Sequence, residues 1–101
     1  FLKHLNETSQ GDGCMLDHTM VLYGSGMNNG VGVEDGKGSH STRKLPTLLA
    51  GGVKLGIKQG QHLLYEKDRT PLCNLHVTLM QGMGLERDHF VDGTGPLTGL
   101  V

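Results

Sequence analysis

The chain has 101 residues, which is enough for one small domain, and at that size folding hides only about two-thirds of the surface that the unfolded chain exposes. Its net charge is −1, with acidic and basic residues interspersed, so the composition favours neither a nucleic acid nor a membrane as a partner. Hydrophobic residues make up 36% of the chain and only four residues are aromatic. These values predict a modest core, and with it either marginal stability of the chain alone or a missing partner.

The first ten residues, FLKHLNETSQ, predict the end of a helix whose earlier turns are absent. Phe1, Leu2 and Leu5 form only a fragment of an apolar helical stripe. The stretch also lacks a methionine and has no basic head followed by a long apolar run. We therefore expect a single domain over residues 1–101 that is a C-terminal fragment of a longer protein.

Two apolar runs predict a pair of strands in a small sheet. Residues Thr19 to Tyr23 are mostly apolar and predict a buried strand. Residues Leu45 to Ala50 predict a second strand, with Pro46 near its start, where a missing N–H is tolerated. The segment from Val53 to Glu66 predicts a weak pair of extended segments that turn near Gly60.

The clearest helical signal lies between Thr70 and Gly84. Thr70 can act as a cap and the proline that follows it suits a first helical turn. Apolar residues then recur at helical spacing, at Leu72, Leu75, Leu79 and Met83, until Gly84 ends the run. The remaining tail is predicted to be irregular and to be held to the body by Phe90, Leu97 and Leu100.

A glycine-rich connection of about twenty residues joins the two predicted strands, a length that is more often functional or mobile than neutral. Its first glycines follow the spacing G-x-G-x-x-x-G, which differs from the dinucleotide fingerprint, and no helix or G-K-[ST] ending follows them. We therefore interpret the glycines as turn formers rather than as a phosphate cradle. The binding-loop candidates in this region are Gly24, Ser25, Gly26, Asn28 and His40.

Limited proteolysis checks the interpretation of this connection as a mobile segment. We expect a protease to cut between Asn28 and Arg43 before it cuts anywhere inside Leu45 to Gly84, because glycine-rich backbone has little packing to resist opening. Mass spectrometry of the first fragments identifies the site. Protection equal to that of the predicted helix would contradict the interpretation and favour a packed binding loop.

Few side chains in the sequence are candidates for catalysis or metal binding. His18 and His40 precede the two predicted strands and could meet as metal ligands or as an acid–base pair, but the favoured interpretation is a solvated loop histidine and a histidine that is hydrogen-bonded at a strand start. His76 is expected to be half-buried beside the apolar stripe, and His89 to lie in a solvated turn.

Other residue combinations give weaker evidence for a functional site. Asp17 and His18 are adjacent, so on an extended segment their side chains would point to opposite faces. The serines have no G-x-S-x-G setting that would mark a nucleophile. Cys14 and Cys73 can form a disulfide or remain two separate buried thiols; the second interpretation is favoured, and the compartment stays open.

Several sequence blocks occur together in a recognisable order: MLDHTMVLYGSGM, LPTLLAGG, GIKQGQHLLY, TPLCNLHVTLMQGMGL and DGTGPLTGL. In this order they resemble the C-terminal part of the bacterial proteins grouped as domain of unknown function 1552. That group is distantly similar to the alkaline-phosphatase-like and sulfatase superfamily. The resemblance implies an α/β fold with a small mixed sheet flanked by helices, as in the C-terminal part of a three-layer sandwich. It is also compatible with a secreted or periplasmic location.

The resemblance does not supply a complete active site. Where the superfamily places an Asp and a His metal ligand at the end of a strand, this chain has Gly24 and Ser25. His40 matches a loop histidine of the resembling family, but a second histidine two positions on is replaced by Thr42. His40 is therefore the single metal-ligand candidate.

Three functions follow as expectations. The favoured one is the C-terminal portion of an alkaline-phosphatase-like protein, with no complete active site in this chain and no cofactor of its own. The alternatives are part of a metal-dependent phosphate or sulfate ester hydrolase, with a divalent metal held by the full-length parent, or a protein-binding scaffold module. In each case exposed strand edges and apolar surface predict a homo-oligomer, with contacts around the first strand or the Leu72, Leu75 and Leu79 stripe. No small-molecule ligand is identified.

Overall fold

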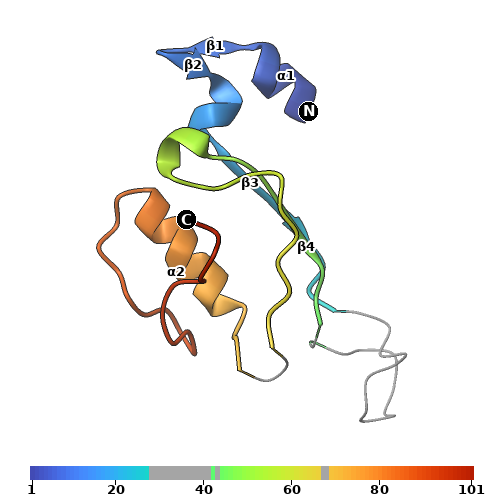
Figure 1. Ribbon diagram of the computed structural model, residues 1–101, viewed down its shortest axis with the longest axis vertical. Helices are drawn as coiled ribbons and strands as arrows, with labels where there is room; N and C mark the ends of the chain where they lie inside the picture. The colour runs from blue at the N-terminus through green and yellow to red at the C-terminus, as the bar shows by residue number, and fades with distance from the viewer. Residues whose placement is uncertain (28–41, 43, 67–68) are drawn as a thin grey trace.

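A computed structural model of the chain describes residues 1–27, 42, 44–66 and 69–101. These residues form two α-helices, two short 3₁₀ turns and two separate two-stranded antiparallel sheets (Figure 1). The predicted combination of helices and strands in a small chain is confirmed. The described residues do not form a three-layer sandwich, and neither of their sheets is mixed.

The N-terminal segment is a short helix followed by a small hairpin. Helix α1 spans Leu2–Glu7, as the sequence predicted, and none of its residues is buried. Strands β1 (Ser9–Gln10) and β2 (Gly13–Cys14) pair in an antiparallel hairpin. The backbone N–H of Met15 donates to the carbonyl of Thr8 at 2.7 Å and so closes this hairpin.

A 3₁₀ turn, η1 (Met15–His18), follows the hairpin and is capped by Asp17. The Asp17 Oδ2 atom accepts a hydrogen bond from the Cys14 backbone N–H at 2.9 Å. This bond is made to the charged carboxylate, so it holds the pKa of Asp17 below its usual value. This role of Asp17 was not predicted from the sequence, in which Asp17 stood out only as a neighbour of His18.

Asp17 should therefore contribute to acid sensitivity. A carboxyl whose pKa is lower in the folded state stabilises the fold above its unfolded-state pKa, which is about 3.9, and this contribution disappears as the pH falls through the folded-state pKa. We expect an NMR titration midpoint for Asp17 below 3.9 and a shallower acid-unfolding profile for Asp17→Asn. A midpoint at or above the ordinary value would contradict the capping role.

The second sheet pairs β3 (Met20–Gly24) with β4 (Thr47–Gly51). Met20 lies opposite Gly51 at one end of this ladder, and Gly24 lies opposite Thr47 at the other. The two predicted strands thus exist, each displaced by one or two residues from its expected start. Figure 1 shows them as one long ribbon that extends away from the N-terminal hairpin.

The two faces of the β3–β4 sheet differ in their surroundings. Side chains alternate along a strand, so Met20, Leu22 and Leu49 share one face. Met20 and Leu49 on this inner face pack against the core. The opposite face, which we call the outer face, consists of Val21, Tyr23, Leu48 and Ala50.

The prediction that the first strand is buried was wrong. Tyr23 is 73% exposed, and its cross-strand partner Leu48 is 69% exposed. Leu22, on the inner face, is still 38% exposed. The apolar run correctly indicated a strand with two apolar faces, but the described residues bury only part of one of them.

The segment after β4 differs from the predicted pair of extended arms. Residues Val53–Leu55 form a 3₁₀ turn, η2, flanked by Gly52 and Gly56 with φ angles of 75° and 87°. Both values lie in the left-handed region, which glycine adopts without strain. Described residues downstream, 58–66, form no strand. Individual side-chain hydrogen bonds connect this segment to the rest of the chain; for example, the Tyr65 hydroxyl donates to the Thr98 carbonyl at 2.9 Å.

Helix α2 spans Cys73–Gly82, and the predicted helix is therefore confirmed. Its cap residue is Leu72 rather than Thr70, and no side chain caps it. The predicted apolar stripe was only partly right, because Leu75 is buried while Leu72 and Met83 are 44% and 69% exposed. The buried residues of the helix are Asn74, Leu75, Val77 and Thr78.

Two of these buried residues are polar because they hold the C-terminal tail. The Asn74 side chain donates to Thr94 Oγ1 at 3.1 Å and accepts from the Thr94 backbone N–H at 2.8 Å. The Thr78 hydroxyl accepts from the Leu97 backbone N–H at 2.7 Å and donates to the Asn74 carbonyl at 3.0 Å. The tail is irregular and forms no β-ladder, so its backbone N–H groups need other hydrogen-bond acceptors. The side chains of Asn74 and Thr78 supply them.

The core lies between α2, the tail and the inner face of the β3–β4 sheet. Its central cluster is Ile57, Leu75 and Leu100, and five partly buried residues pack against it: Met20, Leu49, Leu63, Leu79 and Leu97. Leu97 and Leu100 thus hold the tail as predicted, whereas Phe90 is 42% exposed. Among the described residues, four hydrophobic side chains are buried and fourteen large ones are exposed. This imbalance shows that few of the large apolar side chains in the described part of the chain are fully buried.

Candidate functional site

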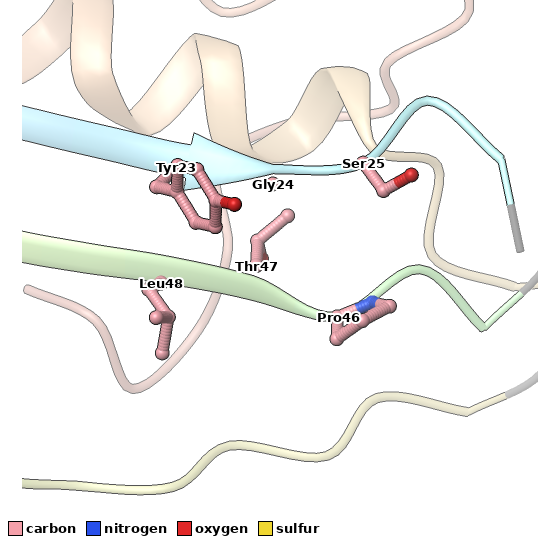
Figure 2. Close-up of a pocket in the computed structure, with 6 residues that line it drawn as sticks. All are labelled: Tyr23, Gly24, Ser25, Pro46, Thr47 and Leu48. Atoms are coloured by element: carbon pink, nitrogen blue, oxygen red, sulfur yellow. The ribbon is translucent and has the colours of Figure 1, made fainter.

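A shallow hollow of about 200 Å³ lies where β3 and β4 end beside the glycine-rich connection. Figure 2 shows its lining, which comes from both strands and the residues next to them: Tyr23, Gly24, Ser25, Pro46, Thr47 and Leu48. The lining contains hydroxyl groups and apolar carbon but no ionisable group other than the Tyr23 phenol. Such a surface has neither a charged anchor for an ionic substrate nor a base for catalysis.

Gly24 lies close to the side chain of its partner on β4. A Cβ atom on Gly24 would lie 2.9 Å from Cγ2 of Thr47. Because this distance is shorter than a normal van der Waals contact, a larger residue at position 24 would require the Thr47 side chain to change its rotamer or the strands to shift. The structure therefore gives Gly24 a packing contact within the sheet.

The Ser25 hydroxyl is engaged in a local turn. Its Oγ donates to the Met27 carbonyl at 2.5 Å and accepts from the Met27 backbone N–H at 3.3 Å. This arrangement closes a serine turn at the end of β3. No described basic side chain hydrogen-bonds to Ser25, so the geometry provides no activated nucleophile.

The predicted site residues are only partly testable in the structure. Gly24 and Ser25 line the hollow, and Gly26 follows them in chain order. Asn28 and His40 lie outside the described residues, as does most of the predicted mobile connection. Sequence reasoning missed Tyr23 and Leu48, although their apolar character on the second face of each strand was a readable signal.

His18 lies at the opposite end of the ladder from this hollow. It ends η1, immediately before the Met20 end of β3, whereas the connection that carries His40 leaves and enters the sheet at the Gly24–Thr47 end. His40 lies outside the described residues, so a site shared by His18 and His40 stays a prediction.

The surroundings of His18 are those of a structural contact. Its buried Nε2 atom lies 3.4 Å from Asp12 Oδ1 without forming a hydrogen bond. The other Asp12 oxygen accepts from the Lys54 ammonium at 2.7 Å, which lowers the pKa of Asp12 and raises that of Lys54. This ion pair joins the first hairpin to η2 and already places a cation beside the carboxylate.

No group of three or more His, Cys, Asp or Glu side chains could hold a metal ion within residues 1–27, 42, 44–66 and 69–101. In the same residues, no helix is long and apolar enough to cross a membrane.

The two histidines of the C-terminal half make packing contacts. The His76 ring lies 5.9 Å from the Phe90 ring at an interplanar angle of 59°. His76 is half-buried as predicted, but its buried Nδ1 atom has no hydrogen-bond partner among the described residues. The His89 ring is not simply solvated, because its Nδ1 lies 2.7 Å from the Gly93 carbonyl and bonds to it.

Both cysteines are free and half-buried. The favoured interpretation of two separate thiols is therefore confirmed, although neither thiol is fully buried. A hydrogen bond to the Asp92 carboxylate raises the pKa of Cys73, because it favours the protonated thiol. Cys73 is consequently a poor nucleophile at neutral pH despite its place in the first turn of α2.

No protein family, no curated protein and no solved structure matches this chain.

Proposed function

We propose that this chain is the C-terminal portion of a larger alkaline-phosphatase-like protein, in which it contributes structure and no complete active site. The observation that carries the proposal is the outer face of the β3–β4 sheet, where Tyr23 and Leu48 are largely exposed while Val21 and Ala50 are half-buried. The order of the sequence blocks supports the family resemblance, and the exposed part of this face supports the proposal that more polypeptide covers it.

The amino-acid composition of β3 and β4 explains why we expect a second layer over this face. A sheet with one solvated face alternates apolar and polar residues, whereas a sheet buried on both faces has continuous apolar strands. In β3 the consecutive residues Met20, Val21, Leu22 and Tyr23 are all apolar or aromatic. In β4 Leu48, Leu49 and Ala50 repeat this pattern. Both strands therefore have the composition of a sheet that is covered on both sides.

The described elements supply one of the two required layers. Helix α2 and the C-terminal tail form the core with the inner face through Met20 and Leu49. Another layer over Tyr23 and Leu48, together with further strands, would complete the three-layer sandwich that the sequence resemblance implies. In the isolated chain the same exposed surface favours association between copies, and we propose that it forms homo-oligomers.

The gene sequence that precedes the codon for Phe1 tests the family and the activity of the parent separately. We expect upstream strands with apolar residues on both faces, which would supply the missing layers. A cluster of Asp or Glu at strand ends with a Ser, Thr or Cys nucleophile would identify the parent as a metal-dependent ester hydrolase. A reading frame with no upstream α/β sequence would overturn the proposal.

Metal titration tests the proposal that the chain lacks a complete site. Catalytic metal sites use about three protein ligands, and His40 is the single candidate that the family resemblance provides. We expect isothermal titration calorimetry with zinc or manganese to show no one-to-one binding at micromolar affinity. Binding of that strength that His40→Ala abolishes would contradict this expectation and favour the hydrolase alternative.

A further inference from the structure

We draw no further inference here: the strongest candidate, the uncovered apolar outer face of the β3–β4 sheet, belongs to the proposed function already described, and nothing in the structure shows what else would cover it.

Discussion

Replacing Leu48 by lysine is expected to raise the dissociation constant for self-association of the chain by about tenfold or more. Leu48 is 69% exposed on the outer face, near the Gly24–Thr47 end of the sheet and beside Tyr23 on the neighbouring strand (Figure 2). Full burial of a leucine side chain contributes about 1.5–3 kcal/mol, and tenfold in affinity corresponds to about 1.4 kcal/mol. A lysine on an exposed sheet also disfavours contact with a second sheet.

Met83→Lys is the matched control for this substitution. Met83 is also 69% exposed, but it lies at the end of α2, away from the outer face. A lysine at a helix C-terminus is compatible with the helix dipole, so the control should fold normally. Sedimentation equilibrium of both variants gives the comparison. Equal effects of the two substitutions, or no effect of Leu48→Lys, would show that copies do not associate through the outer face.

Replacing Asn74 by alanine is expected to lower the free energy of unfolding by about 1–3 kcal/mol. Asn74 is 7% exposed and makes two hydrogen bonds to Thr94. Its removal breaks both of these bonds, and each hydrogen bond of this kind contributes about 0.5–1.5 kcal/mol. In a domain of this size, a loss of 1 kcal/mol lowers the melting temperature by about 4–8 °C.

The control for Asn74→Ala is Gln81→Ala, which removes an amide side chain from the same helix. The Gln81 amide donates to the Arg87 carbonyl at 2.7 Å, but this bond is exposed to solvent. Water can replace it, so we expect a change of no more than about 0.5 kcal/mol. Urea unfolding followed by circular dichroism measures both variants. A loss for Asn74→Ala no greater than that for Gln81→Ala would show that the hydrogen bonds between Asn74 and Thr94 do not stabilise the fold.

The strands and the long helix were predictable because their signals are local. Consecutive apolar residues indicated β3 and β4, and apolar spacing indicated α2. The glycines at positions 51 and 52 correctly marked the end of the second strand. These elements depend on short-range patterns, which a single sequence contains.

The polar residues of the core were not predictable, because their roles depend on distant parts of the chain. Asn74 and Thr78 interrupt the apolar face of α2, and only their contacts with the Thr94 to Leu97 segment explain them. Contacts such as those of Asn74 and Thr78 override local propensity because they join distant parts of the chain. By contrast, η2 replaced a predicted extended arm for a local reason, because two glycines adopt left-handed conformations beside it.

The candidate site was predictable only in part. Gly24 and Ser25 were identified at the correct end of the sheet, but their roles in packing and in a local turn required side-chain geometry. The apolar outer face followed from the same sequence runs, yet its exposure could not be known without the number of layers. A sequence records that a face is apolar but does not record whether its covering layer is present.

Sedimentation velocity of the unmodified chain over a range of micromolar concentrations shows whether copies associate through the exposed sheet face. Because Tyr23 and Leu48 leave an apolar part of the β3–β4 sheet exposed, we expect a folded chain whose sedimentation coefficient rises with concentration. A folded, stable monomer with no concentration dependence would contradict this expectation, because the chain would then close its own core without a second layer.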